Sequence, residues 1–351
     1  MRIKTRKEQL SNAIKTVLPF TGKLNEFTDI KFLVNGNILK LVAQSETASN
    51  IYKLNIEADE DFEFSVNGSE INNIVDTFKS EITITKENET LIISEGKTKL
   101  KLICNINAMP IQQLNSENTL ETTYQDIKNG LIKTVDFTDK KQQAGVITGV
   151  LFAIEQNKIK FAGTDGNFLS LCEYEKEISE EVNHKFILPV NIVKELIKID
   201  SEFVKITWTN SKIKFDFEYM EITTHLINGA YPQVEAFFNV PLKDTLEISK
   251  EELSSALKKA QLLTTKDKFV LNFEIEKEEI KISFENSTKS LNDYISCKFT
   301  GDRKFIKLNC ELLPIVIKNC SDIINIRFSE QNKQAIYFEN ENNKMILMVC
   351  S

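Results

Sequence analysis

The residues best suited to acid–base or metal chemistry are few in this chain of 351 residues. Its two histidines, His184 and His225, both fall in strand-like sequence, and neither has a partner at a spacing typical of a catalytic site. Asp165 lies in a Thr-Asp-Gly step, where an Asp-Gly pair favours a tight turn and needs no catalytic role. We therefore interpret these residues as structural.

Larger chemical motifs are missing as well. The sequence contains no glycine-rich phosphate loop, no HExxH and no nucleophile elbow. Its six cysteines form no CxxC pair and no zinc-like spacing, so we expect reduced thiols packed mostly in the interior. The sequence predicts no active site, no metal and no cofactor.

Three similar stretches organise the rest of the chain. They occupy residues 2–21, 120–139 and 246–265, roughly 120 residues apart, which is about the size of one compact domain. Each begins as a strand and continues as an amphipathic helix, because apolar residues recur at helical spacing. The apolar positions are Leu10, Ala13, Ile14 and Val17 in the first copy, Ile127, Leu131 and Val135 in the second, and Leu253, Leu257 and Ala260 in the third.

Further blocks follow each helix in the same order. Hairpins are predicted at residues 33–46, 152–165 and 273–286. A strand then leads into a second helix at residues 62–78, 185–199 and 304–319, followed by a strand pair at residues 81–94, 204–217 and 324–338. We expect Ser69 to cap the second helix in the first copy, Pro189 to begin it in the second, and Asn309 to cap it in the third. Pro314 predicts a kink or a late start in that last helix.

The repeat predicts an α+β architecture of three repeated domains, each with two helices packed on antiparallel sheets. The polar residues 112–119 and residues 238–245 are the expected linkers. The predicted domains therefore span residues 1–117, 118–242 and 243–351.

Basic residues gather on the predicted helices although the formal net charge is −7. The faces opposite the apolar stripes carry Lys15, Lys133 and the pair Lys258 and Lys259, whereas acids stand at the helix starts. Acids at the start and lysines near the end of one helix also match its macrodipole, so one helix alone indicates little. The same arrangement in three helices favours a basic surface that contacts phosphate.

The composition indicates a folded chain, because 41% of the residues are hydrophobic while Gly and Pro number only 11 and 6. No apolar run approaches the length of a membrane span, and the first residues lack the apolar core of a signal peptide. We therefore expect a cytoplasmic protein that makes no membrane contact.

The middle repeat carries three segments in a fixed order: FAGTDGNFLSL at residues 161–171, ILPVNIVKELIKI at 187–199 and LINGAYPQVEAFF at 226–238. These segments resemble the middle domain of the β sliding clamp, the β subunit of bacterial DNA polymerase III. That family has ATDGHRLA, a VPRK-type helix entry and a DGxFPDY segment in the same order. The threefold repeat and the chain length fit the family as well.

The resemblance implies a non-catalytic processivity factor for DNA replication. In this family two chains form a head-to-tail homodimer, a six-domain ring around double-stranded DNA that is held without regard to sequence. The ring tethers the catalytic subunit of DNA polymerase III, the clamp loader and other proteins with a clamp-binding motif. The expected DNA-facing residues are Lys15, Lys23, Lys133, Lys140, Lys141, Lys258, Lys259, Lys266 and Lys268.

The resemblance also implies a pocket that takes a short apolar peptide, between the middle and last domains. The matching residues are Ile147, Thr164, Gly166, Phe168, Leu169, Pro232, Phe237, Met345, Leu347, Met348 and Val349. An apolar groove with methionines suits peptide capture by a few anchor side chains. Any single one of these apolar residues is equally well explained as ordinary core.

Three departures from the family motifs concern this pocket. Asn167 and Phe168 stand where the family usually has His and Arg, and Ala236 stands where it has an Arg. The chain ends LMVCS at residues 347–351 in place of an MPMRL-like tail. We therefore expect a more apolar pocket that is adapted to a diverged peptide.

The dimer contact of the family implies a further set of residues. Apolar residues after the first helix of the last domain would meet the second helix of the partner's first domain. The expected interface residues are Ile74, Phe78, Leu262 and Leu263.

Two functions in different classes stay open at this point. The first is a ring-forming clamp on DNA. The second is a clamp-like scaffold for protein partners that has altered or lost DNA encirclement, which the changed pocket and tail permit.

Overall fold

The computed structural model describes residues 1–22, 25–105, 114–140, 145–178, 183–263 and 270–350. The chain divides into two compact units, one of Met1–Gln125 with Lys198–Leu226 and the other of Asp126–Ile197 with Ile227–Ser351. The middle third of the sequence therefore contributes to both units. The division into three domains at residues 117 and 242 stays a prediction.

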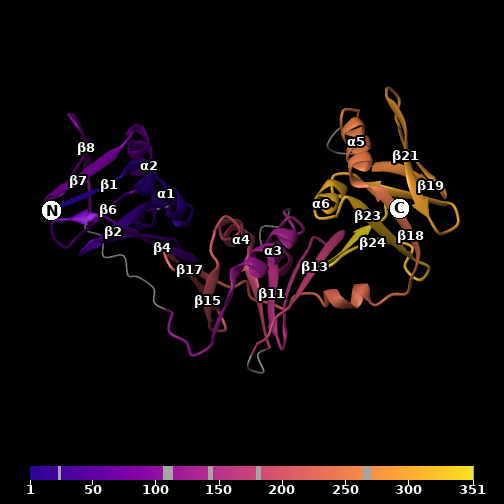
Figure 1. Ribbon diagram of the computed structural model, residues 1–351, viewed down its shortest axis with the longest axis horizontal. Coiled ribbons are helices and arrows are strands. Elements are labelled where there is room, and N and C mark those ends of the chain that lie inside the picture. The colour runs from indigo at the N-terminus through magenta and orange to yellow at the C-terminus, as the bar shows by residue number, and fades with distance from the viewer. Residues whose placement is uncertain (23–24, 106–113, 141–144, 179–182, 264–269, 351) are drawn as a thin grey trace. The chain divides into compact units, whose positions relative to one another are not determined.

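The first unit contains two antiparallel sheets and the helices α1 and α2 (Figure 1). The helices span Lys7–Val17 and Gly68–Thr77 and pack against each other. The smaller sheet has the order β5 (Glu57–Ala58), β1 (Arg2–Arg6), β7 (Glu81–Glu87), β8 (Thr90–Glu95) and β9 (Thr98–Ile103). The larger has the order β10 (Thr119–Thr123), β15 (Phe203–Trp208), β16 (Lys212–Asp216), β17 (Met220–His225), β4 (Ala48–Asn55), β3 (Ile38–Gln44), β2 (Asp29–Asn35) and β6 (Phe62–Asn67).

The second unit is built on one antiparallel sheet of 12 strands. Their order is β14 (His184–Pro189), β11 (Gly149–Glu155), β12 (Lys158–Thr164), β13 (Phe168–Glu175), β25 (Asn343–Met348), β24 (Ala335–Asn340), β23 (Ile323–Ser329), β18 (Leu242–Ser249), β21 (Ser290–Phe299), β20 (Glu279–Glu285), β19 (Val270–Ile275) and β22 (Lys304–Asn309). The helices α4 (Val190–Leu196), α5 (Lys250–Gln261) and α6 (Leu313–Lys318) belong to this unit, and α3 (Tyr124–Val135) begins at the boundary. The 3₁₀ helices are η1 (Leu18–Phe20), η2 (Asn25–Thr28), η3 (Val146–Thr148) and η4 (Val234–Phe238).

The predicted apolar stripes are the buried faces of the first helices. Leu10, Ala13, Ile14 and Val17 of α1 are buried, and so are the matching residues of α3 and α5. At about 1.5–3 kcal/mol for each fully buried large apolar side chain, these stripes attach the helices to the sheets. The predictions of the three first helices, α1, α3 and α5, are confirmed.

The starts of the second helices differ from the prediction at two places. Asn67, rather than Ser69, caps α2, because its side-chain oxygen accepts the N–H of Glu70 at 3.1 Å. Asn309 does not cap α6, because the N-cap residue is Leu312 and the Asn309 side chain accepts the N–H of Glu311 instead. The helix starts late, at Leu313, as Pro314 predicted, since the missing N–H of Pro314 removes no helical bond in the first turn. Pro189 precedes the first residue of α4, as predicted.

Two pairings between distant strands were not predicted. In the first unit β4 pairs with β17, and in the second unit β13 pairs with β25. We call these the first and the second junction. Each joins a hairpin strand of one predicted domain to the last strand of the next, which extends one sheet across the predicted boundary.

Five of the cysteines are buried and Cys350 is half-buried, and all six are unpaired thiols, in line with the interpretation from spacing. Burial raises the pKa of the Cys310 thiol to about 12, so it stays protonated. Across the described ranges, no helix combines the length and the apolar character needed to cross a membrane.

Candidate functional site

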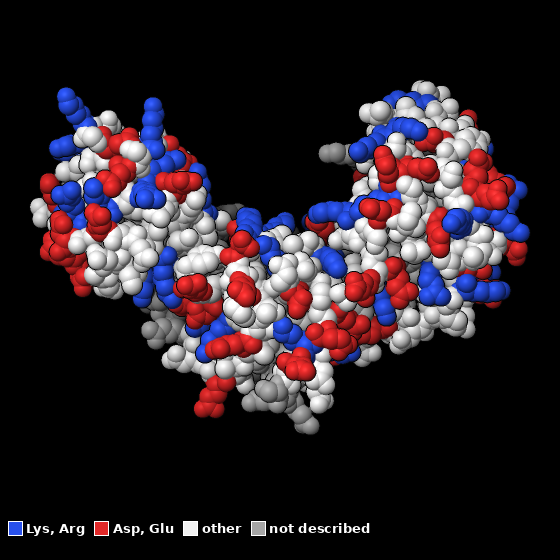
Figure 2. Space-filling view, viewed as in Figure 1, with Lys and Arg blue, Asp and Glu red and all other residues white. Residues whose placement is uncertain are grey.

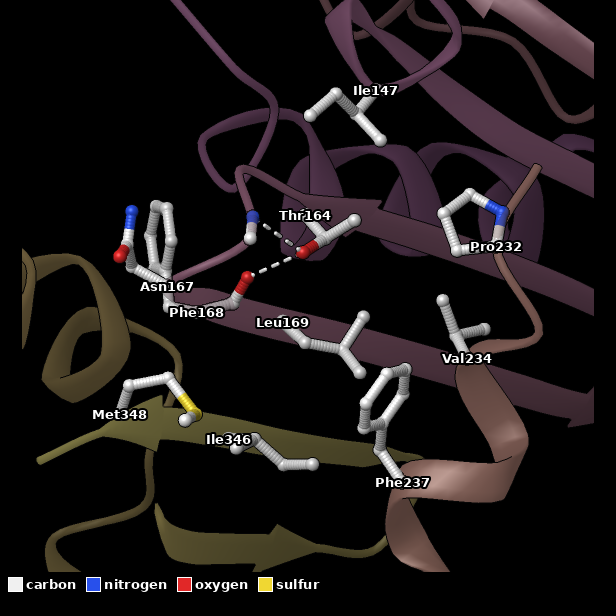
Figure 3. A pocket seen from close by; sticks show the side chains of 11 residues that line it. Ile147, Thr164, Asn167, Phe168, Leu169, Pro232, Val234, Phe237, Ile346 and Met348 are labelled. Atoms are coloured by element: carbon white, nitrogen blue, oxygen red, sulfur yellow. Dashed lines mark hydrogen bonds between the residues drawn. The ribbon is translucent and has the colours of Figure 1, made fainter. Parts of the chain in front are cut away.

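An apolar pocket lies at the second junction, where β13 and β25 run side by side (Figure 3). Successive side chains of a strand point to opposite faces, so each strand offers alternate residues to the pocket. Leu169 pairs with Ile346, and both line the pocket together with Met348. Met345 and Leu347, which alternate with them along β25, belong to the main core of the unit and are fully buried.

The Thr-Asp-Gly step forms the turn at one end of the pocket. The Thr164 hydroxyl donates to the Phe168 carbonyl at 2.8 Å and accepts the N–H of Gly166 at 3.1 Å (Figure 3). A carboxylate oxygen of Asp165 accepts the N–H groups of Asn167 and Phe168. Gly166 has φ +89°, which favours glycine. These bonds account for the conformation of the turn, as expected for a structural Asp165.

The second wall comes from the segment that ends in η4. Pro232, Val234 and Phe237 line the pocket from this side (Figure 3). Val234 is buried, whereas the Phe237 ring is 56% exposed. The Tyr231 hydroxyl lies 3.3 Å from the Ala162 carbonyl of β12 and helps to hold the segment on the sheet.

Most of the residues expected from the family resemblance line this pocket. They are Ile147, Thr164, Gly166, Phe168, Leu169, Pro232, Phe237 and Met348. Three expectations are wrong for the lining: Met345 and Leu347 lie on the core face of β25, and Val349 packs against the core beyond the strand. Three lining residues were missed: Asn167, Val234 and Ile346.

The pocket is suited to apolar side chains. Its volume is about 240 Å³, below the ~300 Å³ at which sites for whole small molecules begin. The walls are aliphatic, aromatic and thioether groups, with hydroxyl and amide groups only at the Thr164 turn. Such a site fits a few anchor side chains of a partner rather than a polar substrate.

The basic helix faces carry lysines that are already paired with acids. Lys15 of α1 lies 2.9 Å from Asp76 of α2, which Lys7 also approaches at 3.6 Å. In the second unit, Lys259 of α5 lies 2.8 Å from Asp293 of β21. The hydrogen bonds of Asp76 to Lys15 and Ser11, together with the nearby ammonium charges, lower the pKa of its carboxyl.

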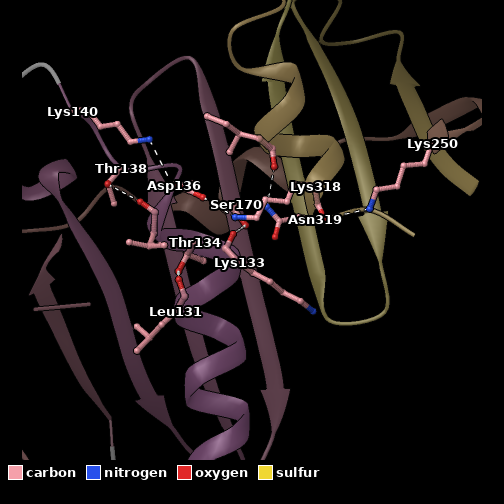
Figure 4. Close-up of polar contacts among 12 residues, drawn as sticks. Leu131, Lys133, Thr134, Asp136, Thr138, Lys140, Ser170, Lys250, Lys318 and Asn319 are labelled. Carbon is pink, nitrogen blue, oxygen red and sulfur yellow. Dashed lines mark hydrogen bonds and ion pairs between the residues drawn. The ribbon is translucent and has the colours of Figure 1, made fainter. Parts of the chain in front are cut away.

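A related cluster lies at the end of α3 (Figure 4). Asp136 lies 3.3 Å from Lys318 of α6 and 3.8 Å from Lys140. Lys133 places its ammonium 5.9 Å from the centre of the Tyr174 ring, a cation–π distance. Lys318 was not predicted, and its position in the last turn of α6 is the sequence signal that could have identified it.

The remaining predicted DNA-facing lysines fall into two groups. Lys258 is exposed on α5. Lys23, Lys141, Lys266 and Lys268 lie outside the described residues. On the face drawn in Figure 2, basic and acidic side chains are interspersed, as the ion pairs between them require.

The predicted interface residues differ in their accessibility. Leu262 is 81% exposed directly after α5, whereas Leu263 and Ile74 are half-buried. Phe78 is only 4% exposed and belongs to the core of its own unit, so the prediction of an available Phe78 is wrong. The sequence analysis did not single out Ile103 as an exposed apolar residue, although it is 77% exposed at the end of the edge strand β9.

The titratable residues of the described ranges include His225, which lies at the end of β17. Burial, with a smaller contribution from Lys212, lowers the pKa of His225 and favours its neutral form. In the part of the chain that the structure describes, no group of His, Cys, Asp and Glu side chains is arranged to hold a metal ion.

Comparison with known proteins gives one consistent family. Residues 123–233 match the family model of the central domain of the DNA polymerase III beta subunit. The beta sliding clamp of Chlamydia trachomatis is 23% identical over 227 residues, which is 63% of this chain and 54% of the relative. The match thus spans about half the length of that relative. The beta sliding clamp of Mycoplasma genitalium is 27% identical over 304 residues, covering 80% of this chain and 79% of the relative.

Solved structures agree along the whole chain. The sliding clamp of Pseudomonas aeruginosa bound to griselimycin has a TM-score of 0.93 at 16% identity, covering 100% of this chain and 99% of that one. The DNA polymerase III subunit beta of Borrelia burgdorferi, in complex with a natural product, has a TM-score of 0.90 at 21% identity, covering 100% and 98%. At these identities the likeness shows the fold, and it confirms the predicted α+β class of repeated clamp domains.

Proposed function

We propose that this chain, a diverged relative of the β sliding clamps of bacterial DNA polymerase III, is itself a DNA sliding clamp. It acts without chemistry of its own, as a processivity factor in the cytoplasm that encircles duplex DNA as a head-to-tail homodimer. It tethers the replicative polymerase, the clamp loader and other proteins that carry a short apolar motif. The observation that supports this most strongly is the apolar pocket at the second junction, formed by the residues that resemble the clamp motifs.

Peptide capture by the pocket rests on its lining. Leu169, Ile346 and Met348 offer an apolar wall, and the exposed Phe237 ring stands opposite as an anchor for a partner. Asn167 and Phe168 replace the His and Arg that the family usually has, and Phe168 stacks on Phe137 at 4.6 Å between ring centroids. The pocket is therefore less charged than the family pattern implies and selects apolar over polar flanks.

DNA retention rests on the lysines of the helices. Lys15, Lys133, Lys140, Lys258 and Lys259 would contact phosphates without regard to sequence, and Lys318 joins them. Because Lys15, Lys140 and Lys259 each have a carboxylate partner, a phosphate must compete for them. Weak contacts of this kind suit a ring that topology retains and that must slide.

The homodimer would place the exposed Leu262 against an apolar surface of the partner. In the first unit the most exposed apolar residue of β9 is Ile103, so this edge strand is a better candidate for the opposing surface than the buried Phe78. Replacing Leu262 by Lys should convert a dimer into a monomer in sedimentation or light-scattering measurements. A chain that is monomeric before any substitution would contradict the closed ring.

The peptide site is tested with a Leu/Phe-containing clamp-binding peptide. Met348→Lys and Phe237→Lys should each weaken binding by about 30-fold, which corresponds to the loss of a 2 kcal/mol hot spot. Leu169→Lys should also weaken binding, but Leu169 is buried, so the two more accessible positions decide. Tyr294→Lys is the control, because Tyr294 is an exposed aromatic residue that does not line this pocket. Unchanged affinity in both Met348→Lys and Phe237→Lys would remove the assignment.

A second function in a different class is a clamp-like scaffold that binds protein partners without encircling DNA. The pairing of Lys15, Lys140 and Lys259 with carboxylates favours it, since these pairs reduce the net positive charge of the helix faces. Peptide binding without topological retention on DNA would support the scaffold over the clamp.

A further inference from the structure

Lys160 is a nearly buried charged residue beside the pocket, and it serves no role described so far. It lies on β12, and its side chain is only 9% exposed. Lys160, Ala162 and Thr164 alternate along the strand and therefore share one face. Thr164 lines the pocket, and four residues of strand place Lys160 about 13 Å further along the same face. Lys160 itself is not one of the residues that line the pocket.

Three carboxylates surround the Lys160 ammonium. Glu155 of β11 lies at 2.8 Å, Glu235 of η4 at 3.3 Å and Glu173 of β13 at 3.7 Å. Glu155 and Glu173 belong to the sheet, whereas Glu235 belongs to the segment that covers it. Lys160 therefore connects the sheet to η4 through one ionic contact.

The segment around Glu235 also supplies the pocket wall. Val234 directly precedes Glu235, and Phe237 follows it by two residues. Val234 is buried against the sheet in the same apolar cluster as Ala162 and Leu171. Any shift of η4 away from β12 therefore moves Val234 and the Phe237 ring with it, and so changes the pocket.

The charges of this group do not balance fully, because two ammonium groups face three carboxylates: besides Lys160, Lys158 lies 3.6 Å from Glu173. Burial acts to lower the pKa of Lys160, but its hydrogen bonds to Glu155 and Glu235 and their charges outweigh burial, and the net shift is upward. Burial acts to raise the pKa of Glu235, but its own backbone N–H and Lys160 outweigh burial, and the net shift is downward. Both groups are therefore charged at neutral pH. Without Lys160, Glu173 would keep its partner Lys158, but Glu155 and Glu235 would lose the ammonium between them and repel each other at the base of η4.

We propose that Lys160 is a positioning residue for the peptide pocket, because it fastens η4 to the sheet through Glu235 and so sets the place of Val234 and Phe237. This rests on the proposed function of the pocket as a peptide site. Lys160 and Glu235 act on affinity through the wall that they hold, and neither contacts the peptide.

The effect of Glu235→Gln on peptide affinity, measured with and without Lys160, distinguishes a positioning role of the Lys160–Glu235 ion pair from general stabilisation of the fold. In the wild-type background Glu235→Gln removes the attraction to Lys160 and should weaken peptide binding about 3-fold, as for a partly exposed ion pair. Lys160→Met keeps the length of the side chain and leaves the repulsion, and it should weaken binding about 10-fold. In the Lys160→Met background, Glu235→Gln removes a repelling acid and should therefore restore part of the affinity. A residue with a merely structural role would give losses that add.

Two further readouts follow η4 directly. The amide protons of Ala236 and Asn239 should exchange faster with solvent in Lys160→Met, because their bonds within η4 lose the support of the sheet. Lys160→Arg should keep affinity within about 2-fold, since it retains the charge. The matched control is the exposed pair Lys243 and Glu330, at 2.7 Å in the same unit, where Lys243→Met should leave affinity and exchange unchanged.

The outcomes separate the two proposals. If the peptide does not bind the wild type, or if Met348→Lys and Phe237→Lys both leave affinity unchanged, the pocket assignment itself fails. If those hold and Lys160→Met binds like the wild type, or if Glu235→Gln lowers the affinity of Lys160→Met further, the positioning role is wrong. Should Lys160→Met not fold, Glu235→Lys at the more exposed position decides, since it should weaken binding about 10-fold by placing two ammonium groups together. Unchanged affinity there would overturn the proposal.

Discussion

The two junctions have the same backbone geometry but different side chains. At the first junction the N–H of His225 donates to the Thr47 carbonyl at 2.8 Å, and at the second the N–H of Met348 donates to the Asn167 carbonyl at 2.9 Å. Ser49 pairs with Thr223 in the first, just as Leu169 pairs with Ile346 in the second. The same pairing of strands therefore occurs twice in the chain, once in each unit.

The outward positions of the two junctions differ in polarity. Leu169, Ile346 and Met348 of the second junction line the pocket. Their counterparts in the first junction are Ser49, Thr223 and His225, which offer hydroxyl and imidazole groups. The comparison teaches that the pairing of strands supplies a platform, and that the side chains on it decide whether the platform binds an apolar partner.

The inward positions show the opposite relation, because both junctions bury a polar side chain there. The Asn50 amide donates to the Thr16 carbonyl at 3.3 Å and to the Met220 sulfur at 3.4 Å. The Ser170 hydroxyl lies 2.9 Å from the Lys133 carbonyl and 2.9 Å from the Asn343 side-chain oxygen. Each links its junction to the last turns of a first helix, α1 or α3.

The largest expected effect comes from giving the second junction the polarity of the first. Leu169→Ser combined with Met348→His should weaken binding of the clamp-binding peptide at least 100-fold, because two anchors are lost together. Fluorescence anisotropy measures it. The matched change in the other direction, Ser49→Leu with His225→Met, should leave affinity unchanged because it lies in the first unit. Equal losses from both double variants would show that the two junctions do not differ in the way described.

A smaller effect is expected from the buried polar links. Asn50→Ala should lower the free energy of unfolding by about 1–3 kcal/mol, because it removes both hydrogen bonds and leaves the Thr16 carbonyl without its amide donor. Ser170→Ala should cost about 1–2 kcal/mol for the same reason. Urea titration with probes in each unit should show Asn50→Ala in the first unit's transition and Ser170→Ala in the second's. If either variant shifts the unfolding transitions of both units, the Asn50 and Ser170 hydrogen bonds do not stabilise their own units separately.

The smallest effect concerns the ion pairs between helix lysines and aspartates, which occur in both units. Asp76→Asn and Asp293→Asn should each strengthen DNA binding by about 2-fold, because the first frees Lys15, and also removes the weaker contact to Lys7, and the second frees Lys259. Each exposed ion pair is worth about 0.2–1 kcal/mol. The dependence of the binding constant on salt should steepen by close to one released ion for each variant. Glu330→Asn is the control, because its partner Lys243 lies outside the proposed DNA surface. Identical salt slopes in all variants would show that these lysines do not meet phosphate.

Much of the fold could be predicted because local patterns of apolar residues determine the helices and hairpins. The stripe of Leu10, Ile14 and Val17 determines which face of α1 is buried, and alternation determines the hairpins. The junctions could not be predicted this way. The choice of β17 as the partner of β4 depends on which distant edges the finished units bring together, and the local periodicity of either strand carries no information about it.

The sequence predicted most of the residues of the pocket, but it did not predict correctly which face of the strand each residue lies on. The motif around Thr164 and Gly166 located the pocket, but Met345 and Leu347 were placed on the wrong side of β25. The prediction took residues from both faces of this strand, since it also included Met348, which does line the pocket, and it omitted Ile346. The ends of α2 were missed for a related reason: several residues there could serve as caps or as surface, and only packing separates Asn67 from Ser69 or buries Phe78.

Retention on DNA circles tests the central claim most directly. The protein is loaded by a clamp loader and ATP onto nicked circular DNA, the circles are isolated by gel filtration, and half are then linearised. The account predicts that the protein stays on the circles and leaves the linear DNA, and that replacing Lys15, Lys133, Lys258 and Lys259 together by Glu abolishes retention while circular dichroism stays unchanged. A protein that leaves circular and linear DNA equally would contradict encirclement and favour the scaffold.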